Sequence, residues 1–372
     1  MSAAAAALLL PGCTFLLSGC ALLPLESPKV SRFSSRSDPE VSSPYREAVG
    51  VIHVHSAYSD GSLPVEQIAR AAERQGLDYL ILTDHDTLQG RRDGKEGRYG
   101  KTLVLVDTEI STAAGHYLAL GLTEEVPSRR PAAETVRAVG SQGGLGFIAH
   151  ATWKKRPWPE MDVEGITGLE IYDLASDVSD EFPVQVALGA VLAGPDLSLP
   201  AWVDRPRGLL ALWDRLLARG RRVVGIGSVE AHGLQWAGFR LGPYSTVFKL
   251  VRNHLLIEGE LTPRSVREAI GKGHLFVAHD IFADARGFLF AATAGGALRG
   301  VMGDEVRLAP GLRLYAYLPS PGRMVFLRDG EAAARAEGQH GWFKVTGPGV
   351  YRLEATRRGR PWVYSNPIYV LE

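Results

Sequence analysis

Short apolar runs alternate with segments of helical periodicity from residue 48 to about residue 280, and this alternation constrains the fold more than any other feature of the chain. Each run has the length of a buried β-strand, and the segments between runs, such as 65–75 and 132–142, place apolar residues three and four apart. Repeated strand and helix units are typical of a parallel sheet or barrel covered by helices. The predicted strands are Val49–Val54, Tyr79–Leu82, Leu103–Val106, Tyr117–Leu120, Leu145–Ile148, Leu169–Ile171 and Val223–Ile226.

Histidines and acids follow the predicted strands at their carboxyl ends. In barrels and open parallel sheets these ends meet at one mouth, where active sites are assembled. Histidines placed at random in a core would not be sorted in this way. The side chains are His53 and His55; Asp84, His85 and Asp86; Asp107 and Glu109; His150; and Glu230 with His232.

A metal site in the body of the chain has only nitrogen and oxygen ligands available, because both cysteines, Cys13 and Cys20, lie in the first twenty residues. His53 and His55 are two apart in a predicted strand, so we expect both on one face, where they could meet one ion. Alone, such a pair is explained equally well by hydrogen bonds to backbone carbonyls. Asp60, in a Ser-Asp-Gly sequence, is by itself better explained as a turn residue.

The polar motifs follow a definite order: His53-x-His55 with Asp60-Gly61, Thr83-Asp84-His85-Asp86, Glu109, His116, His150 and Glu230-Ala231-His232. In this order, and at the ends of successive strands, they resemble the PHP (polymerase and histidinol phosphatase) superfamily. The resemblance covers roughly residues 48–280. It implies a distorted (β/α)7 barrel that holds two or three Zn, Mn or Fe ions and hydrolyses phosphoesters.

The resemblance also implies a role for each ligand. His53, His55, Glu109 and Glu230 match the ligands of one metal; Asp60, His85 and His232 match those of another; His116 and His150 complete a third with Glu109 or act on the phosphate. One position departs from the family, which usually has Asp where this chain has Glu230. Glutamate is one methylene longer but is still a hard oxygen donor. Asp84 and Asp86 are predicted to orient the ligand histidines through hydrogen bonds, without binding the metal themselves.

The expected reaction is hydrolysis of a small phosphomonoester or nucleotide-type phosphate by a metal-activated hydroxide. His150 or His116 would protonate the leaving oxygen. Two alternatives remain open, an exonuclease-like phosphodiesterase and a non-catalytic metal-binding scaffold of the cell envelope. The 41 basic and 41 acidic residues give a net charge of zero, so strong nucleic-acid binding is not expected.

Two clusters of basic residues follow the metal motifs: Lys154, Lys155 and Arg156 after His150, and Arg91, Arg92 and Lys95 after the motif at 83–86. The first cluster is predicted to hold the substrate phosphate, and a solvated basic turn explains it equally well. The second cluster carries the same hypothesis, although a solvated helix face explains it better.

The first residues are predicted to be a signal peptide over 1–19. Leu17-Ser18-Gly19-Cys20 resembles the bacterial lipobox, which implies that Cys20 is lipidated and anchors the protein to a bacterial membrane on its extracytoplasmic side. Residues 20–47 are rich in serine and proline and are predicted to be a tether. The residues directly after Met1 include no Lys or Arg, which a signal peptide usually has there. An ordinary cleaved signal or an uncleaved apolar tail therefore remains an alternative.

The barrel is predicted to occupy residues 48–283, interrupted at 174–222 by a lid-like insertion with Pro195, Pro200 and Pro206 and a helix near 209–217. Residues 284–372 are predicted to form a small antiparallel β-sandwich, with a hairpin turn at Asp329-Gly330. Its expected strands are 312–317, 324–327, 350–355 and 362–371. Its aromatic residues Trp342, Trp362 and Tyr364 are better explained as core than as a glycan or partner surface.

Overall fold

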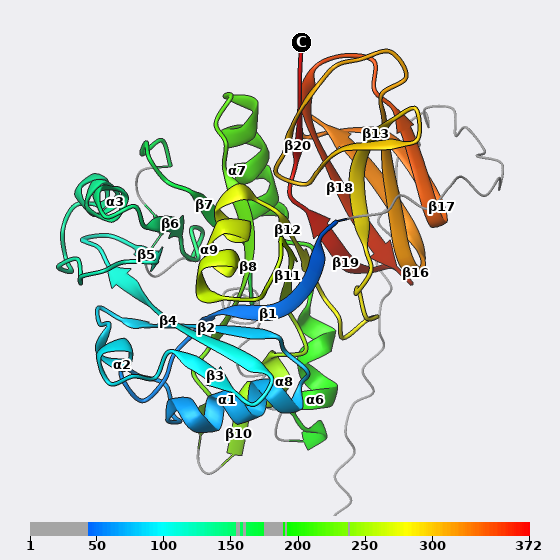
Figure 1. The fold of residues 1–372 in the computed structure, drawn as a ribbon. Helices are drawn as coiled ribbons and strands as arrows, with labels where there is room; N and C mark the ends of the chain where they lie inside the picture. Colours follow the sequence, from blue (N-terminus) through cyan, green and yellow to red (C-terminus); the bar gives the residue numbers. More distant parts are fainter. Residues whose placement is uncertain (1–43, 154–156, 159–160, 175–188, 190–191, 237–238) are drawn as a thin grey trace, which may run out of the picture. The chain divides into compact units, whose positions relative to one another are not determined.

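A ring of strands closes into a barrel in this computed structural model, which describes residues 44–372 apart from 154–156, 159–160, 175–188, 190–191 and 237–238. Each strand of the ring pairs with the next, and the last pairs back with the first (Figure 1). In ring order the strands are β1 (Arg46–Val54), β2 (Tyr79–His85), β4 (Thr102–Ser111), β5 (His116–Leu120), β6 (Leu145–Ile148), β7 (Gly168–Asp173) and β8 (Val224–Ala231). The predicted distorted barrel is confirmed.

The distortion has a definite place in the ring. β5 pairs antiparallel with both β4 and β6, whereas the other neighbours in the ring are parallel. Only residues 112–115 connect β4 to β5, too few for the helical crossover that a parallel neighbour needs. The antiparallel turn therefore reverses the chain at the rim of the barrel, between Glu109 and His116.

Helices pack outside the strands and bury one face each. Helix α1 lies in the predicted helical segment 65–75, follows Pro64, and buries Val65, Ile68 and Ala72 against the barrel. Helix α9 begins at a capping box formed by Thr262 and Ser265. The helices are α1 (Val65–Arg74), α2 (Gln89–Arg92), α3 (Ala132–Ser141), α6 (Pro195–Ser198), a 3₁₀ turn (Leu199–Trp202), α7 (Arg207–Ala218), α8 (Tyr244–Val247) and α9 (Pro263–Lys272).

The segment predicted as a lid-like insertion contains a regular barrel helix. α7 buries Leu210, Trp213 and Leu217, and the indole Nε1 of Trp213 donates to the carbonyl of Val223 at 2.7 Å. α7 therefore completes the connection from β7 to β8, and residues 207–218 are part of the barrel wall. The nearby prolines precede this helix and do not interrupt it. The segment 175–188 lies outside the described residues.

Two further strands extend the barrel sheet from β1. The first half of β1 pairs antiparallel with β11 (Arg252–Ile257), and β11 pairs with β12 (Leu275–Ala278). β12 pairs in turn with β19 (Arg360–Ser365), so the sheet continues into the C-terminal strands. Short strands complete the barrel region: β3 (Gly97–Tyr99), β9 (Leu234–Trp236) and β10 (Phe239–Gly242). The predicted boundary near residue 284 remains a prediction.

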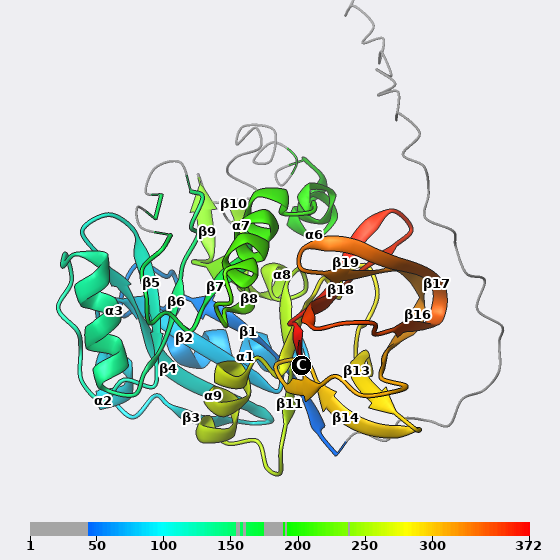
Figure 2. The same cartoon turned by 90° about the horizontal axis from the view of Figure 1, so that it is seen from above.

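The C-terminal strands are antiparallel with one exception, a parallel pairing of β15 with β20. Figure 2 shows β13, β14 and β16 to β19 in this region. The two strands expected at 312–317 and 324–327 form one long strand, which shifts its register between Tyr317 and Gly322. The single strand expected at 362–371 is divided in two. The bounds are β13 (Leu289–Ala294), β14 (Ala297–Val301), β15 (Glu305–Arg307), β16 (Arg313–Arg328), β17 (Glu331–Lys344), β18 (Gly349–Arg357), β19 (Arg360–Ser365) and β20 (Ile368–Leu371).

Local details of these strands agree with the sequence. Asp329 and Gly330 connect β16 to β17 with φ of 54° and 85°, as a tight hairpin requires. Trp362 and Tyr364 are buried, and Trp342 is partly buried. The core explanation therefore fits Trp362 and Tyr364. No helix among residues 44–372, as far as they are described, has the length and apolar character to cross a membrane.

A buried histidine connects the barrel strands to the chain after β12. His254 of β11 places Nδ1 2.6 Å from Glu47 Oε1 and Nε2 3.2 Å from Asp280 Oδ2. Both ring nitrogens can donate only when the imidazole is protonated. Burial lowers the pKa of His254, but Asp280 and Glu47 outweigh it and raise the pKa to about 9. The pair of carboxylates therefore stabilises a charged histidine between β1 and β12.

We expect the free energy of unfolding to fall as pH rises from 6.5 to 9, because the stabilisation by His254 is complete below the unfolded pKa of about 6.5 and is lost through the folded pKa. The difference is on the order of 3 kcal/mol at most. Urea unfolding across this range should show a steeper decline for the wild type than for His254→Gln. Equal pH slopes in the two proteins would contradict this assignment.

Candidate metal centre

The predicted metal ligands converge at the mouth formed by the carboxyl ends of the parallel barrel strands and the start of the antiparallel strand β5. His53 lies in β1, and His55 and Asp60 follow that strand. His85 ends β2, and Glu109 lies in β4. His116 begins β5, His150 follows β6, Glu230 lies in β8 and His232 follows it. Side chains far apart in the chain thus meet because their strands are neighbours in the ring.

The ligand atoms form three groups, within each of which all lie within 4.8 Å of one another. The first group is His53, His55, Glu109 and Glu230; the second is His55, Asp60, His85 and His232; the third is His85, Glu109 and His116. His55, His85 and Glu109 each belong to two groups. The three groups are therefore adjacent and form one centre, as expected for a site that holds more than one ion.

Glu109 lies at the middle of this centre and is fully buried. Its Oε2 is 3.0 Å from His53 Nε2, 3.3 Å from His55 Nε2 and 3.2 Å from His85 Nδ1. Its Oε1 is 2.9 Å from His116 Nδ1 and 3.1 Å from His150 Nε2. The two oxygens thus face different sets of histidines, which is the arrangement that a bridging carboxylate requires.

His150 lies beside the third group and is not a member of it. Its Nε2 is 3.1 Å from His116 Nδ1 as well as from Glu109 Oε1. Burial lowers the pKa of His150, but the hydrogen bond and charge of Glu109 outweigh it and raise the pKa to about 9. In the absence of metal, His150 therefore carries a proton at neutral pH.

The buried donors of the centre fit a divalent cation. Five of these atoms lie 2.5–3.4 Å from one another in ion pairs, without a well-aligned hydrogen bond among the described residues: His53 Nε2, His55 Nε2, His85 Nδ1, Glu109 Oε2 and Glu230 Oε2. Buried polar atoms are normally hydrogen-bonded, so several such atoms that face one point are unusual in a folded protein. A cation bound by imidazole nitrogens and carboxylate oxygens would satisfy them together.

Charges within the centre favour protonated imidazoles and ionised carboxylates. Burial lowers the pKa of His55, but Glu109 and Glu230 raise it further, to about 9. Burial acts in the opposite direction on Glu230, whose pKa is nevertheless held well below its usual value by His53. Because a metal ligand must be a neutral imidazole, a bound cation has to displace these protons. Metal affinity is therefore expected to rise with pH.

Strained backbone at three site residues aims their side chains inward. His53, His150 and Glu230 have φ of 71°, 29° and 46°, in the left-handed region that non-glycine residues avoid. A register shift between Val51 and Val54 places His53 in a β-bulge. The prediction that strand alternation brings His53 and His55 to one face is wrong in its reason, because the bulge breaks the alternation and His55 follows the strand.

Glu170 is a site residue that the sequence analysis missed. It is fully buried in β7, and its Oε1 is 2.6 Å from His53 Nδ1. Its Oε2 accepts a hydrogen bond from the backbone N–H of His150 at 2.6 Å. Glu170 thus directs His53 Nε2 toward Glu109 and Glu230, as outer carboxylates do for metal-binding histidines. The available signal was a single acid within the apolar run 169–171.

Asp84 and Asp86 hold the backbone of the loops. Asp84 accepts hydrogen bonds from the backbone N–H and the hydroxyl of Ser56, both at 2.7 Å, and from the hydroxyl of Ser59 at 2.8 Å. Asp86 accepts from the backbone N–H of Ser111 at 2.7 Å. The described contacts of both acids differ from the prediction that they orient histidines directly. Asp84 instead fixes the loop that carries Asp60.

The second basic cluster is engaged in ion pairs away from the centre. Arg91 contacts Asp107 at 2.7 Å and the carbonyls of Val106 and Leu122. The remaining pairs of this cluster are Arg92 with Glu125 at 2.8 Å and Lys95 with Glu66 at 2.6 Å. The hypothesis that these cations hold a substrate phosphate is therefore not supported. Lys154, Lys155 and Arg156 lie outside the described residues, as does Cys20.

A comparison with known protein families finds a match, which covers the first part of this site. The family model described as PHP domain matches residues 52–190, which include the motifs from His53 to His150. The motif at Glu230 and His232 lies beyond the matched region. The family resemblance is thus confirmed for residues 52–190.

Two curated relatives match shorter segments. An uncharacterized protein of Methanocaldococcus jannaschii is 27% identical over 144 residues, which are 35% of this chain and 79% of that protein. The phosphoribosyl 1,2-cyclic phosphate 1,2-diphosphodiesterase of Eggerthella lenta is 34% identical over 84 residues, 21% of this chain. The chain covers only 32% of that second protein's length.

One solved structure is similar over most of the chain. It is a two-domain protein of Bacteroides vulgatus described as containing a predicted PHP-like metal-dependent phosphoesterase. Its sequence is 14% identical, with a TM-score of 0.45, and the match covers 90% of this chain and 99% of that one.

Glu170→Gln is expected to lower metal affinity about 10–100-fold, because the amide cannot accept from both His53 and His150 as the carboxylate does. The measurement is metal content after dialysis against a series of free-metal concentrations. Asp107→Asn is the matched control, since it removes a buried carboxylate that binds Arg91 and Arg267 outside the centre. Wild-type affinity in Glu170→Gln, or an equal loss in the control, would refute the positioning role.

Proposed function

We propose, from the PHP domain match over residues 52–190 and the centre around Glu109, that the protein is a metal-dependent phosphoesterase. The observation that carries the proposal is the convergence of buried imidazole nitrogens and carboxylate oxygens in three adjacent groups, without well-aligned hydrogen bonds. Stability alone does not explain this convergence, because burying several ionisable groups at one point is costly. The atoms have a clear use as ligands of a multinuclear site.

Divalent ions bound there would activate a water molecule and neutralise negative charge on a phosphate. The first group would hold one ion through His53, His55, Glu109 and Glu230, and the second would hold another through His55, Asp60, His85 and His232. The third group would hold a further ion through His85, Glu109 and His116. Zn, Mn and Fe all suit this mixture of imidazole and carboxylate ligands.

Proton transfer to the leaving oxygen is assigned to His150 or His116. Both imidazoles lie at Oε1 of Glu109, away from the contact between His53 and Glu230. His150 Nε2 is 3.1 Å from Glu109 Oε1, at the edge of the centre, where a protonated imidazole would have the position of a general acid. The histidine that binds a metal cannot serve in this way, so the acid is whichever of the two remains free of the third ion.

The proposed substrate is a small phosphomonoester or a nucleotide-type phosphate. The net charge of zero supplies no general attraction for a nucleic-acid polymer. A phosphodiester is the second candidate, and the similarity of 84 residues to a protein named as a diphosphodiesterase favours it. The third candidate is a metal-binding scaffold without turnover, which the unusual Glu230 would favour if its carboxylate could not serve as a ligand.

Location at the cell envelope is a further part of the proposal. Its support is the sequence Leu17-Ser18-Gly19-Cys20 and the serine- and proline-rich segment that follows. Lipidation of Cys20 would attach the protein to a bacterial membrane and leave the barrel on the extracytoplasmic side. The segment from 20 to 47 would then serve as the tether.

Protein produced from Ser27 onward and supplied with Mn should bind at least one metal ion per chain and hydrolyse 4-nitrophenyl phosphate. His53→Ala should lower metal content and reduce turnover at least a hundredfold, because His53 contacts both carboxylates of the first group. His340→Ala, on the exposed face of β17, is the control and should behave as wild type. Bis(4-nitrophenyl) phosphate tests the diester candidate in parallel. Less than one ion per chain would overturn the metal-centre proposal.

Glu230→Asp is expected to weaken metal binding and activity about tenfold. Glu230 Oε2 already reaches His53 Nε2 at 2.5 Å and His55 Nε2 at 3.4 Å, so a shorter side chain would withdraw the oxygen from the group. The measurement is hydrolysis and metal content of both proteins in the same buffer. Higher activity in Glu230→Asp would mean that glutamate impairs this position, and metal binding without hydrolysis in either protein would favour the scaffold.

A further inference from the structure

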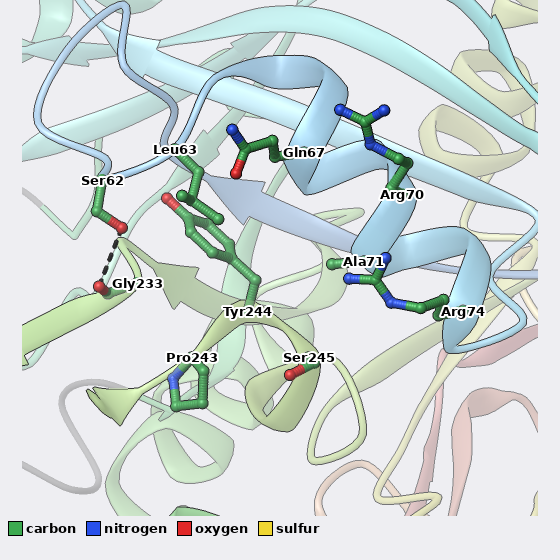
Figure 3. A pocket seen from close by; sticks show the side chains of 10 residues that line it. All are labelled: Ser62, Leu63, Gln67, Arg70, Ala71, Arg74, Gly233, Pro243, Tyr244 and Ser245. Atoms are coloured by element: carbon green, nitrogen blue, oxygen red, sulfur yellow. Dashed lines mark hydrogen bonds between the residues drawn. The ribbon is translucent and has the colours of Figure 1, made fainter. Parts of the chain in front are cut away.

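A second candidate site lies beside the metal centre, in a cavity of about 320 Å³ between α1 and the start of α8. This volume is within the ~300–1,000 Å³ range of small-molecule sites. The cavity is next to the loops that carry Asp60 and His232, since Ser62 and Gly233 line it. Figure 3 shows Arg70 and Arg74 on α1, with Tyr244 on the facing segment.

One face of α1 supplies most of the polar lining. Gln67, Arg70, Ala71 and Arg74 follow the spacing of three and four residues that places side chains on one side of a helix. Ala71, between the two arginines in sequence, also lines the cavity. The lining therefore presents two guanidinium groups from successive turns.

The lining of the cavity contains no carboxylate beside these two guanidinium groups. Neither Arg70 nor Arg74 forms an ion pair with any residue in the described part of the chain, and no acid lines the cavity. Of the carboxylates on the same helix, Glu66 pairs with Lys95 at 2.6 Å and also interacts electrostatically with Arg70, and Glu73 accepts from the backbone N–H of Lys101 at 3.0 Å. The lining itself thus contains two arginines and no acid.

The wall of the cavity opposite α1 is tightly packed around Gly233. Gly233 has φ of 67°, and a Cβ there would lie 2.3 Å from Ser62 Oγ and 2.4 Å from the Tyr244 ring. Glycine is therefore required for the wall to keep its present form. Ser62 Oγ donates to the carbonyl of Gly233 at 3.0 Å, which joins the two sides of the wall. Ser245 adds a hydroxyl to the lining.

We propose that this cavity binds a phosphate group through Arg70 and Arg74. Arginine binds phosphate oxygens through paired N–H donors, and a pair of arginines without carboxylates is suited to a doubly charged anion. The ligand is either the second phosphate of a small phosphorylated molecule or free inorganic phosphate. The metal groups contribute no residue to this site, so it stands apart from the reaction centre.

The wall of the cavity is hydrogen-bonded to the backbone that carries metal ligands. The hydroxyl of Tyr244 donates to the carbonyl of His55 at 2.8 Å. The backbone N–H of Ser62 donates to the carbonyl of His232 at 2.9 Å. A phosphate held against this wall therefore contacts the segments that position His55 and His232, and binding at the two places is expected to be coupled.

The test is calorimetric titration of inorganic phosphate into the metal-free full chain, which prevents phosphate from binding to metal. The wild type should bind, and Arg70→Gln with Arg74→Gln should lose affinity about tenfold for each arginine removed. The control is Arg137→Gln with Arg215→Gln, which removes two exposed helix arginines on α3 and α7 that have no ion pair among the described residues. It should bind as the wild type does.

Absence of phosphate binding to the wild type would overturn the proposal. Unchanged affinity in Arg70→Gln with Arg74→Gln would also overturn it, because the phosphate would then bind elsewhere, for example at the histidines of the centre. These results do not depend on turnover, so they are separate from failure of the proposed phosphoesterase activity.

A kinetic arm with metal-loaded protein distinguishes the two sources of phosphate. If the site takes a second phosphate of the substrate, the double variant should raise KM for 2,3-bisphosphoglycerate and leave KM for glycerol 2-phosphate unchanged. If it takes free phosphate, added phosphate should alter the wild-type rate at concentrations that leave the double variant unaffected. Either result supports the site and assigns its ligand.

Discussion

The buried carboxylate of Glu109 is the interaction on which the arrangement of the barrel mouth depends. Burial disfavours an ionised acid, and the imidazoles around it more than compensate, so its pKa is held well below the usual value. His53, His85, His116 and His150 reach this one side chain from different strands or strand ends. Each strand of this part of the ring is therefore constrained by a charge at its end as well as by apolar packing along its length.

Residues behind the centre give it rigidity. Glu170 fixes His53 and the backbone of His150, and Asp84 fixes the loop that carries Asp60. The strained φ angles of His53, His150 and Glu230 persist because strand pairing and these hydrogen bonds over-determine the backbone. Ligands held by strands in this way are positioned more precisely than ligands on free loops. Such preorganisation is consistent with a site that receives several ions.

The apolar runs predicted the barrel strands well, since burial on both faces requires a continuous apolar sequence. They could not reveal that β5 runs antiparallel, because the same run suits either direction. The sequence places helix α7 in an insertion because prolines at 195, 200 and 206 interrupt the strand and helix pattern between β7 and β8. Two strands are expected at 312–317 and 324–327, whereas β16 is continuous because its pairing with β17 resumes after a register shift between Tyr317 and Gly322.

The types of ligand, their order along the chain and their positions at strand ends were determined by the sequence alone. Residue type sets which atoms can bind a cation, and strand periodicity sets where a strand ends. The tertiary structure decided which partners each charge has: Glu170 contacts His53, Asp107 pairs with Arg91, and no acid lines the cavity of Arg70 and Arg74. These outcomes depend on register and backbone angles between strands distant in sequence. A local sequence pattern does not predict such pairings, because the two partners come from segments that are far apart in the chain.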